Sequence, residues 1–199
     1  MVFNQSKADQ EVIKINLNPG IPPMPVIKDK TKVDIRYILI DPYVTAHIYW
    51  NSKLNELVYE VEEPILNEKE NQDLEKLEQA LLEIININNV IEQTKEAKID
   101  YLNKTARLLI DELSLKLSFE SYKKIFYYLY RNFIGLNQID SLVGDYFIED
   151  IECNGVDTPI YIVHRTYRNM KTNISFNNME KLASFVEKLA QRSGKYISY

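Results

Sequence analysis

The chain has 199 residues, of which 45% are hydrophobic and 27% are charged, and its formal net charge is −5. This composition is typical of a globular protein and excludes a fibrous or wholly disordered chain. The longest apolar run, residues 125–130, is far shorter than the roughly 20 residues that span a bilayer. Cys153 is the only cysteine, which excludes a disulfide framework and a multi-cysteine zinc site. No secretory leader is recognised, so a cytoplasmic protein is expected.

Charge is distributed unevenly along the sequence. Residues 60–100 contain 12 acidic and 4 basic side chains, whereas residues 161–199 contain 7 basic and 2 acidic side chains. We therefore expect a positive surface at one end of the folded chain, suited to phosphates, an acidic partner or a neighbouring copy. A solvated face without a partner is the alternative interpretation.

Residues 1–35 are expected to form a proline-rich arm, either flexible or docked on a partner. Proline fixes φ and removes backbone donors, so this segment can extend but cannot pair continuously in a sheet. Its turn-forming residues are Pro19, Gly20, Pro22, Pro23 and Pro25.

Residues 36–134 are expected to form a small antiparallel sheet and a three-helix bundle that covers it. Alternating apolar residues at 44–50 and 57–61 predict a strand meander, which Pro64 ends. Apolar residues then recur at helical spacing in three stretches. The predicted buried stripes are Leu74, Leu77, Leu81 and Ile84, then Ile99, Leu102, Ala106, Leu109 and Leu113, and finally Tyr122, Ile125, Phe126, Leu129 and Phe133.

Residues 135–199 are expected to form a second small α/β unit, so that the whole chain belongs to the α+β class. A helical turn at 139–143 precedes predicted strands at 148–153, 159–164 and 172–176, with a turn at Asn154-Gly155. Asn177 is the expected cap of a final helix, with Glu180 in the capping-box position. The expected buried stripe of that helix is Leu182, Phe185, Val186 and Leu189.

The residues offer few candidates for catalysis. The sequence contains no G-x-x-x-x-G-K-[ST], G-x-G-x-x-G or H-E-x-x-H motif. Cys153 and His164 could face each other across the Asn154-Gly155 hairpin, although a buried structural thiol is the commoner case. The acidic residues Asp145, Glu149, Asp150 and Glu152 could hold a cation, but strand alternation favours a solvated sheet edge. No catalytic or metal-binding residue is therefore assigned.

Basic residues near the carboxyl end are better candidates for binding. Arg165 and Arg168 are expected in a turn, from which a guanidinium group can reach a phosphate or carboxylate. Lys171, Arg192 and Lys195 are candidate interface residues. Dispersed aromatic residues argue against nucleic-acid binding. Another interpretation is a ligand-sensing module, supported by the aromatic set Tyr37, Tyr43, Tyr49, Trp50 and Tyr59.

One stretch of the sequence resembles a known family. Residues 133–197 are similar to the region that precedes the catalytic core in archaeal secretion ATPases of the type II/type IV superfamily. The matching residues are Gly135, Ile139-Asp140, Leu142, Asp145, Ile148-Glu149-Asp150-Ile151, Asn154-Gly155, Pro159-Ile160, Val163-His164, Tyr167, Met170, Thr172-Asn173-Ile174, Phe176, Leu189-Ala190, Gly194-Lys195 and Ile197-Ser198. Upstream, residues 41–44 and 59–66 also resemble the family, so the similarity covers about residues 35–199.

The resemblance implies an amino-terminal domain of a hexameric ATPase, most like the one that powers and assembles the archaellum, the archaeal flagellum. Pilus-assembly ATPases of the same family are the second choice. ATP and Mg²⁺ would bind between this domain and a RecA-like ATPase domain, whose motifs this chain lacks. The chain alone is therefore expected to be inactive, with Arg165 and Arg168 near the nucleotide. Implied partners are the catalytic domain, neighbouring subunits, a polytopic membrane platform protein and an accessory cytoplasmic motor protein, with peripheral association at the inner face of the membrane.

Overall fold

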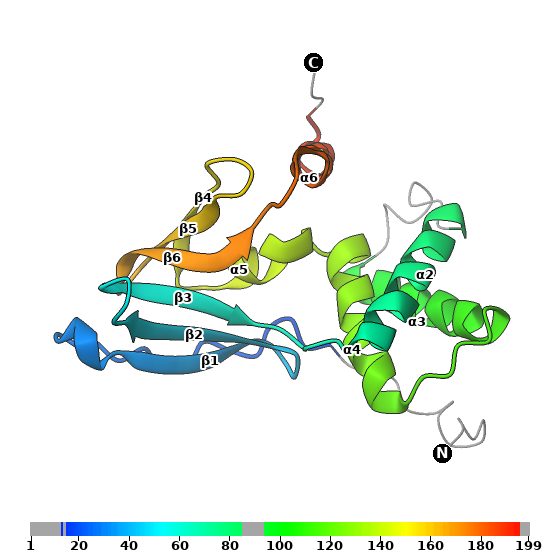
Figure 1. Ribbon diagram of the computed structural model, residues 1–199, viewed down its shortest axis with the longest axis horizontal. Coiled ribbons are helices and arrows are strands. Elements are labelled where there is room, and N and C mark those ends of the chain that lie inside the picture. The colour runs from blue at the N-terminus through cyan, green and yellow to red at the C-terminus, as the bar shows by residue number, and fades with distance from the viewer. Residues whose placement is uncertain (1–12, 14, 85–93, 196–199) are drawn as a thin grey trace. The chain divides into compact units, whose positions relative to one another are not determined.

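The computed structural model describes residues 13, 15–84 and 94–195, and they fall into two compact units. A helical unit is drawn from Met1–Ile15 and Pro64–Gly135, and a sheet unit from Asn16–Glu63 and Leu136–Tyr199 (Figure 1). The expected α+β class is confirmed. Within the described ranges, no helix has both the length and the apolar character needed to cross a membrane.

The helical unit contains the three expected helices, α2 (Glu68–Ile84), α3 (Lys95–Glu112) and α4 (Phe119–Leu129). Most residues of their predicted stripes form its core, but Ile99 and Phe133 are half-buried, and Ile84 and Leu113, at or just beyond the helix ends, are exposed. Thr94 caps α3 and Ser118 caps α4, each accepting a hydrogen bond from a backbone N–H of the first turn. The fully buried core positions include Leu77, Leu81, Leu102, Ala106, Tyr122, Ile125, Phe126 and Leu129.

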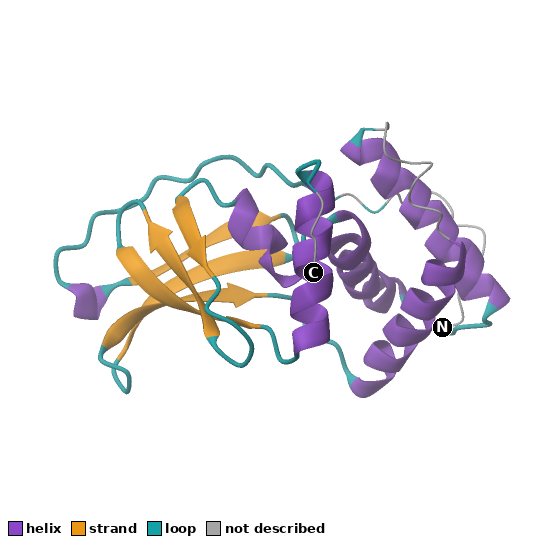
Figure 2. Cartoon of the chain, turned by 90° about the horizontal axis from the view of Figure 1, so that it is seen from above, coloured by secondary structure: helices purple, strands orange, loops and turns teal. Residues whose placement is uncertain are grey.

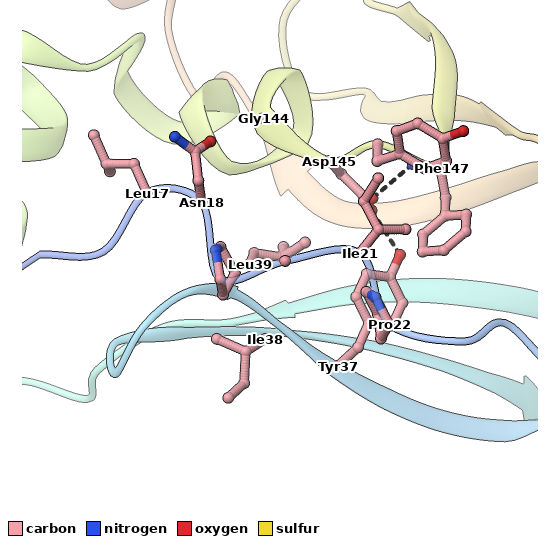
Figure 3. Close-up of a pocket in the computed structure, with 13 residues that line it drawn as sticks. Leu17, Asn18, Ile21, Pro22, Tyr37, Ile38, Leu39, Gly144, Asp145 and Phe147 are labelled. Atoms are coloured by element: carbon pink, nitrogen blue, oxygen red, sulfur yellow. Dashed lines mark hydrogen bonds between the residues drawn. The ribbon is translucent and has the colours of Figure 1, made fainter.

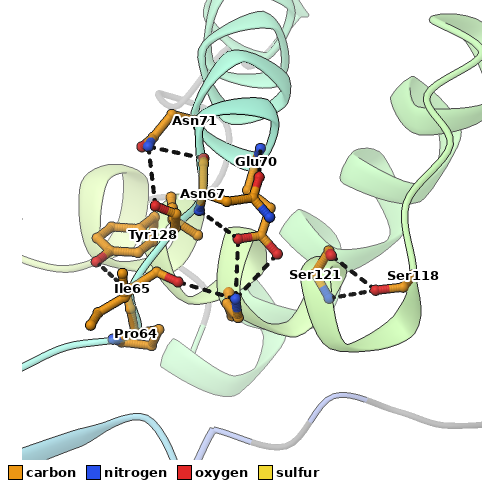
Figure 4. Close-up of polar contacts among 10 residues, drawn as sticks. Pro64, Ile65, Asn67, Glu70, Asn71, Ser118, Ser121 and Tyr128 are labelled. Atoms are coloured by element: carbon orange, nitrogen blue, oxygen red, sulfur yellow. Dashed lines mark hydrogen bonds and ion pairs between the residues drawn. The ribbon is translucent and has the colours of Figure 1, made fainter.

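A polar cluster fixes the start of α2 (Figure 4). Asn67 Oδ1 accepts from the Glu70 N–H and Glu70 Oε2 accepts from the Asn67 N–H, both at 2.9 Å, which is a reciprocal capping box. Lys124 on α4 donates from Nζ to Glu70 Oε2 at 3.1 Å and to the Ile65 carbonyl at 3.1 Å. The cluster therefore joins the first turn of α2 to α4.

The first three strands form the predicted antiparallel meander. They are β1 (Asp34–Ile40), β2 (Val44–Asn51) and β3 (Glu56–Glu62), with Ala46 opposite Val61 in the register. Alternation at β2 buries Val44, Ala46 and Ile48 completely or nearly so, as the period-2 pattern predicts. Asn51 closes the turn to β3 by accepting from the Lys53 and Leu54 N–H groups.

The two groups of strands join into one sheet, which corrects the expected division at residue 135. The strands β4 (Ile148–Glu152), β5 (Pro159–His164) and β6 (Arg168–Ser175) extend the meander in the order β1-β2-β3-β6-β5-β4 (Figure 1). Figure 2 shows the strands, in orange, from above. The β3–β6 junction is parallel and short, and the Asn173 side chain extends it by bonding both the N–H and the C=O of Val61. Pairing with β6 satisfies backbone groups of β3 that an edge strand would leave open. Pro64–Gly135 belong to the separate helical unit instead.

The final helix differs from its prediction in two ways. The helix α6 (Met179–Arg192) is capped by Asn178, which accepts from the Lys181 N–H, so Asn177 and Glu180 do not form the expected capping box. Phe185 is its one fully buried stripe residue among those predicted, and it packs on Phe176 with ring centroids 5.2 Å apart. Val186 and Leu189 are 43% and 41% exposed. The apolar spacing predicted the helix but not how much of its stripe would be covered.

The described part of the proline-rich segment is not a free arm. Asn16 pairs with Asp41 through two backbone hydrogen bonds of 3.0 and 3.1 Å, and the Pro25 carbonyl accepts from the Tyr167 hydroxyl at 2.7 Å. Val33 is buried at its end. An extended segment leaves its carbonyls available as acceptors, so it can pack against its own sheet unit. Residues 1–12 and 14 lie outside the described part of the chain.

The expected helical turn near residue 140 is present. It consists of a 3₁₀ turn, Asn137–Ile139, followed by α5 (Asp140–Gly144). The Leu136 N–H donates to Asp140 Oδ1 at 2.8 Å, and Ile139 and Leu142 are buried. This turn leads directly into Asp145 and β4.

Candidate functional site

The β5–β6 hairpin presents the two arginines that the sequence singled out. Its turn is residues 165–167, and His164 pairs with Arg168 across it. Arg165 and Arg168 are both exposed; Arg165 lies in the turn, as expected, whereas Arg168 is the first residue of β6. The turn stands at one end of the sheet (Figure 1).

Contacts from the neighbouring segment hold this turn, which we call the arginine turn. The Arg165 N–H donates to the Phe147 carbonyl at 2.8 Å. The Arg165 guanidinium lies over the Tyr146 ring, 4.3 Å from its centroid. A guanidinium stacked on an aromatic face keeps its N–H groups available at its edge. The arrangement suits recognition of an oxyanion such as a phosphate or carboxylate.

Arg168 occupies a strained backbone position, which gives a first prediction. Its φ is 64°, in the left-handed region that costs a non-glycine residue roughly 1 kcal/mol. We expect the free energy of unfolding of Arg168→Gly to be about 0.5–1 kcal/mol higher than that of Arg168→Ala. Both substitutions remove the arginine side chain, but only glycine relieves the strain of the positive φ. Urea unfolding of the two variants measures this difference. An alanine variant as stable as the glycine variant would contradict it.

The remaining basic candidates do not join the arginine turn. Lys171 lies within β6 opposite Tyr161 and is half-buried. Arg192 and Lys195 are exposed at the carboxyl end of α6, which follows the other end of β6. Eight residues of extended strand span roughly 25 Å, so the single positive end expected from the sequence is divided between two places.

The four acidic candidates also lie in two different environments, three of them exposed and one buried. Glu149, Asp150 and Glu152 are exposed on the edge strand β4, as expected of a solvated edge. Asp145 is 6% exposed and is fully engaged. Its Oδ2 accepts from the Tyr37 hydroxyl at 2.6 Å and the Tyr59 hydroxyl at 2.7 Å, and its Oδ1 accepts from the Phe147 N–H at 2.8 Å. No cluster of three His, Cys, Asp or Glu side chains able to hold a metal ion occurs among the described residues.

Cys153 and His164 do not face each other. Strand register places His164 opposite Ile148, whereas Glu152, the neighbour of Cys153, lies opposite Tyr161 at the other end of β4. Cys153 is exposed rather than buried on a strand, because β4 ends at Glu152. His164 is fully buried. The pairing that the sequence disfavoured is not formed, and the expected buried thiol is wrong.

A hollow of about 340 Å³ lies beside Asp145 (Figure 3). Its walls are residues 17–22, residues 37–39 of β1 and residues 144–147. Of the aromatic set proposed for ligand sensing, Tyr37 alone lines it. Tyr37 and Tyr59 hydrogen-bond Asp145, and Tyr49 stacks on His47 at 4.4 Å. Tyr37 and Tyr59 therefore belong to the sheet core, and Tyr49 is half-buried outside it.

The sequence did not reveal the partnership of Asp145 with Tyr37 and Tyr59. The two tyrosines lie 108 and 86 residues away in the chain, and only the folded sheet brings them together. The position of Asp145 directly after a helical turn and before a strand was the available signal. Similarly, nothing in the spacing indicated that His164 bonds the arginine turn.

Comparison with known proteins gives two archaeal relatives, and no protein-family model matches. The uncharacterized protein MJ1288 of Methanocaldococcus jannaschii is 41% identical over 143 residues, which are 70% of this chain and 55% of that protein. The uncharacterized protein MJ0900 of the same organism is 30% identical over 84 residues, which are 42% of this chain and 15% of that protein. The chain thus spans about half the length of the first relative and much less of the second.

Proposed function

We propose that this chain is the amino-terminal regulatory, partner-binding and force-transmitting part of a hexameric ATPase of the type II/type IV secretion superfamily, one that drives or assembles the archaellum. The proposal assigns ATP hydrolysis and Mg²⁺ binding to a catalytic domain in the same polypeptide, outside these 199 residues. It places the protein at the inner face of the membrane, bound to a platform protein.

The arginine turn is the observation that carries the proposal. Two exposed arginines lie within four residues, in and just after a turn whose Arg165 N–H donates to the carbonyl of Phe147, directly before β4. Such a pair can stabilise charge on a phosphate held by another domain, as cationic side chains do in phosphoryl transfer. An exposed turn at a sheet end suits contact with a second protein surface.

The relatives support a longer parent protein. The 84 residues that match MJ0900 are 15% of its length, so a segment of this kind occurs within a much larger polypeptide. In such an arrangement, a compact sheet unit would transmit motion of an attached domain to its partners. The exposed α6 side chains Arg192 and Lys195 are then candidate contacts to those partners.

The test is ATP hydrolysis by the complete natural gene product that contains this chain. We expect measurable turnover, and we expect Arg165→Ala and Arg168→Ala each to lower kcat by about 10-fold or more, because each removes charge stabilisation near the phosphates. Lys104→Ala is the control, since Lys104 is an exposed cation of α3 paired with Asp100. Its turnover should match the parent within about twofold. A gene product without ATP hydrolysis, or arginine variants with unchanged kcat, would overturn the proposal.

A further inference from the structure

His164 lies at the end of β5, directly before the arginine turn, and its side chain forms hydrogen bonds with the backbone of that turn. Its side chain is fully buried. Nδ1 accepts hydrogen bonds from the Thr166 N–H at 3.1 Å and from the Tyr167 N–H at 3.2 Å. An imidazole nitrogen that accepts two N–H donors carries no hydrogen, so the ring is neutral and its proton is on Nε2.

The surroundings of the other ring nitrogen, Nε2, indicate why a histidine occupies this position. Nε2 is buried, and among the described residues it has no hydrogen-bond partner. A buried unsatisfied donor is unfavourable, and a leucine or phenylalanine would fill the same space without it. The ring packs on Phe147, with centroids 5.6 Å apart, and on Tyr167 at 5.5 Å. Packing alone therefore does not account for a histidine, whereas the acceptor at Nδ1 does.

We propose that His164 is the positioning residue of the arginine turn: its neutral Nδ1 holds residues 165–167 folded so that Arg165 and Arg168 are presented together, and protonation of Nδ1 at acidic pH releases them. A protonated Nδ1 would point a hydrogen at the Thr166 and Tyr167 N–H groups, so both bonds must break. The backbone of the turn would then keep the bond from the Arg165 N–H to the Phe147 carbonyl but lose both bonds to His164.

Burial of the ring and the charged groups around it determine the pH range in which the turn is released. Burial lowers the pKa of His164 below its ordinary value of 6.5, and the nearby carboxylates of Asp145, which precedes β4, and Glu149, on β4, oppose this less strongly. In the turn itself, the Tyr167 phenol donates to Pro25 and the Arg165 guanidinium lies on Tyr146. Because the folded chain binds this proton less readily than the unfolded chain, the turn is intact above pH 6.5 and loses support as the pH falls through the His164 pKa.

Two variants separate the acceptor from the ring. In His164→Asn, Oδ1 stands where Nδ1 was and can accept the same two N–H groups, but it does not titrate. In His164→Leu the volume is filled and the acceptor is lost. Amide hydrogen-exchange protection factors of Thr166 and Tyr167, measured by NMR on the full chain, report whether the turn is folded and do not depend on ATP. A protection factor is already corrected for the intrinsic pH dependence of exchange.

At pH 7.5 we expect the protection of both amides to fall at least about 10-fold in His164→Leu and less than about threefold in His164→Asn. Between pH 7.5 and pH 5, protection should fall in the parent chain and stay constant in His164→Asn. A histidine Nδ1 signal that shows a bound proton at pH 7.5, or unchanged protection in His164→Leu, would overturn the proposal. If His164→Leu does not fold, the Nδ1 signal and the pH series of the parent chain decide the question.

The consequence of turn release for ATP hydrolysis rests on the proposed function, and it is measured by kcat, separately from amide protection. In the complete gene product, kcat should fall with pH in the same range as the amide protection, and His164→Asn should flatten that part of the profile. Protection that responds to pH without any response of kcat would leave the positioning role intact and count against the proposed function. Protection that does not respond would overturn release by protonation whatever the ATPase does, and unchanged protection in His164→Leu would overturn the positioning role.

Discussion

Replacing Asp145 by alanine is expected to lower the free energy of unfolding by about 4 kcal/mol, the largest effect we predict for a single substitution. The side chain accepts three hydrogen bonds in a buried setting, from Tyr37, Tyr59 and the Phe147 N–H. Burial, reinforced by the Asp145 charge, raises the pKa of both tyrosines far above their ordinary value of 10, so they remain protonated donors at every relevant pH. Alanine leaves all three donors buried without an acceptor.

The control for this prediction lies on the adjoining strand. Glu152→Ala removes an exposed carboxylate from β4 and should change the free energy of unfolding by less than about 0.5 kcal/mol. Tyr59→Phe should cost about 1 kcal/mol by itself and should make a following Asp145→Ala less costly, because one fewer donor is orphaned. Guanidinium unfolding of the four chains measures the cycle. Equal effects of Asp145→Ala and Glu152→Ala would show that the buried network does not stabilise the sheet unit.

Replacing Lys124 by methionine is expected to destabilise the helical unit by about 2–3 kcal/mol. Glu70 is 4% exposed, and Lys124 is its cationic partner at 3.1 Å (Figure 4). Methionine keeps the length of the side chain but leaves the Glu70 charge without that partner and the Ile65 carbonyl without its donor. The expected loss is below that of a fully buried pair because the Lys124 side chain is 36% exposed.

The neighbouring Lys123 gives a matched control. It pairs at 2.9 Å with Glu120 of the same helix, whose side chain is exposed, and Lys123→Met should cost less than about 0.5 kcal/mol. Adding Glu70→Gln to Lys124→Met should restore part of the stability, since glutamine can keep the bond to the Asn67 N–H without a buried charge. A double variant less stable than Lys124→Met alone would contradict the ion-pair explanation.

The same cluster gives the sign of its pH dependence. Burial raises the pKa of Glu70, but the hydrogen bonds from Asn67, Ser121 and Lys124 outweigh it and leave the pKa below its ordinary value of 4.5. The stabilisation from Glu70 is therefore complete above pH 4.5 and is lost as the pH falls through its folded pKa. Unfolding of the parent chain should show this loss, and Glu70→Gln should lack it.

Local patterns predicted most of the individual elements. Period-2 alternation located β2 and β3, and helical spacing located α2, α3 and α4, because each pattern records which face is buried. Errors appeared where neighbouring residues were chemically equivalent. Asn177 and Asn178 can both cap a helix, and only the backbone of Asn178, extended at φ −151° and ψ 160°, decided between them.

The site was predicted in part. Strand pattern and residue type predicted both arginines in the turn, and the structure places Arg165 there and Arg168 at the first position of β6, both exposed. The supports of that turn were not predicted, because Phe147 and Tyr146 come from a segment about twenty residues earlier that reaches the turn only through the pairing of β4 with β5.

By itself the sequence determined the α+β class, the identity of the strands and helices, and the exposure of the arginine turn, because these depend on the local period and chemistry of the chain. The tertiary structure alone decided that strands from both halves share one sheet, since β3 and β6 meet across more than a hundred residues. That pairing brings Asp145 within hydrogen-bonding distance of Tyr59, and the hairpin brings His164 within hydrogen-bonding distance of the backbone of the arginine turn. Hydrogen bonds between such distant residues depend on register, which no local pattern records.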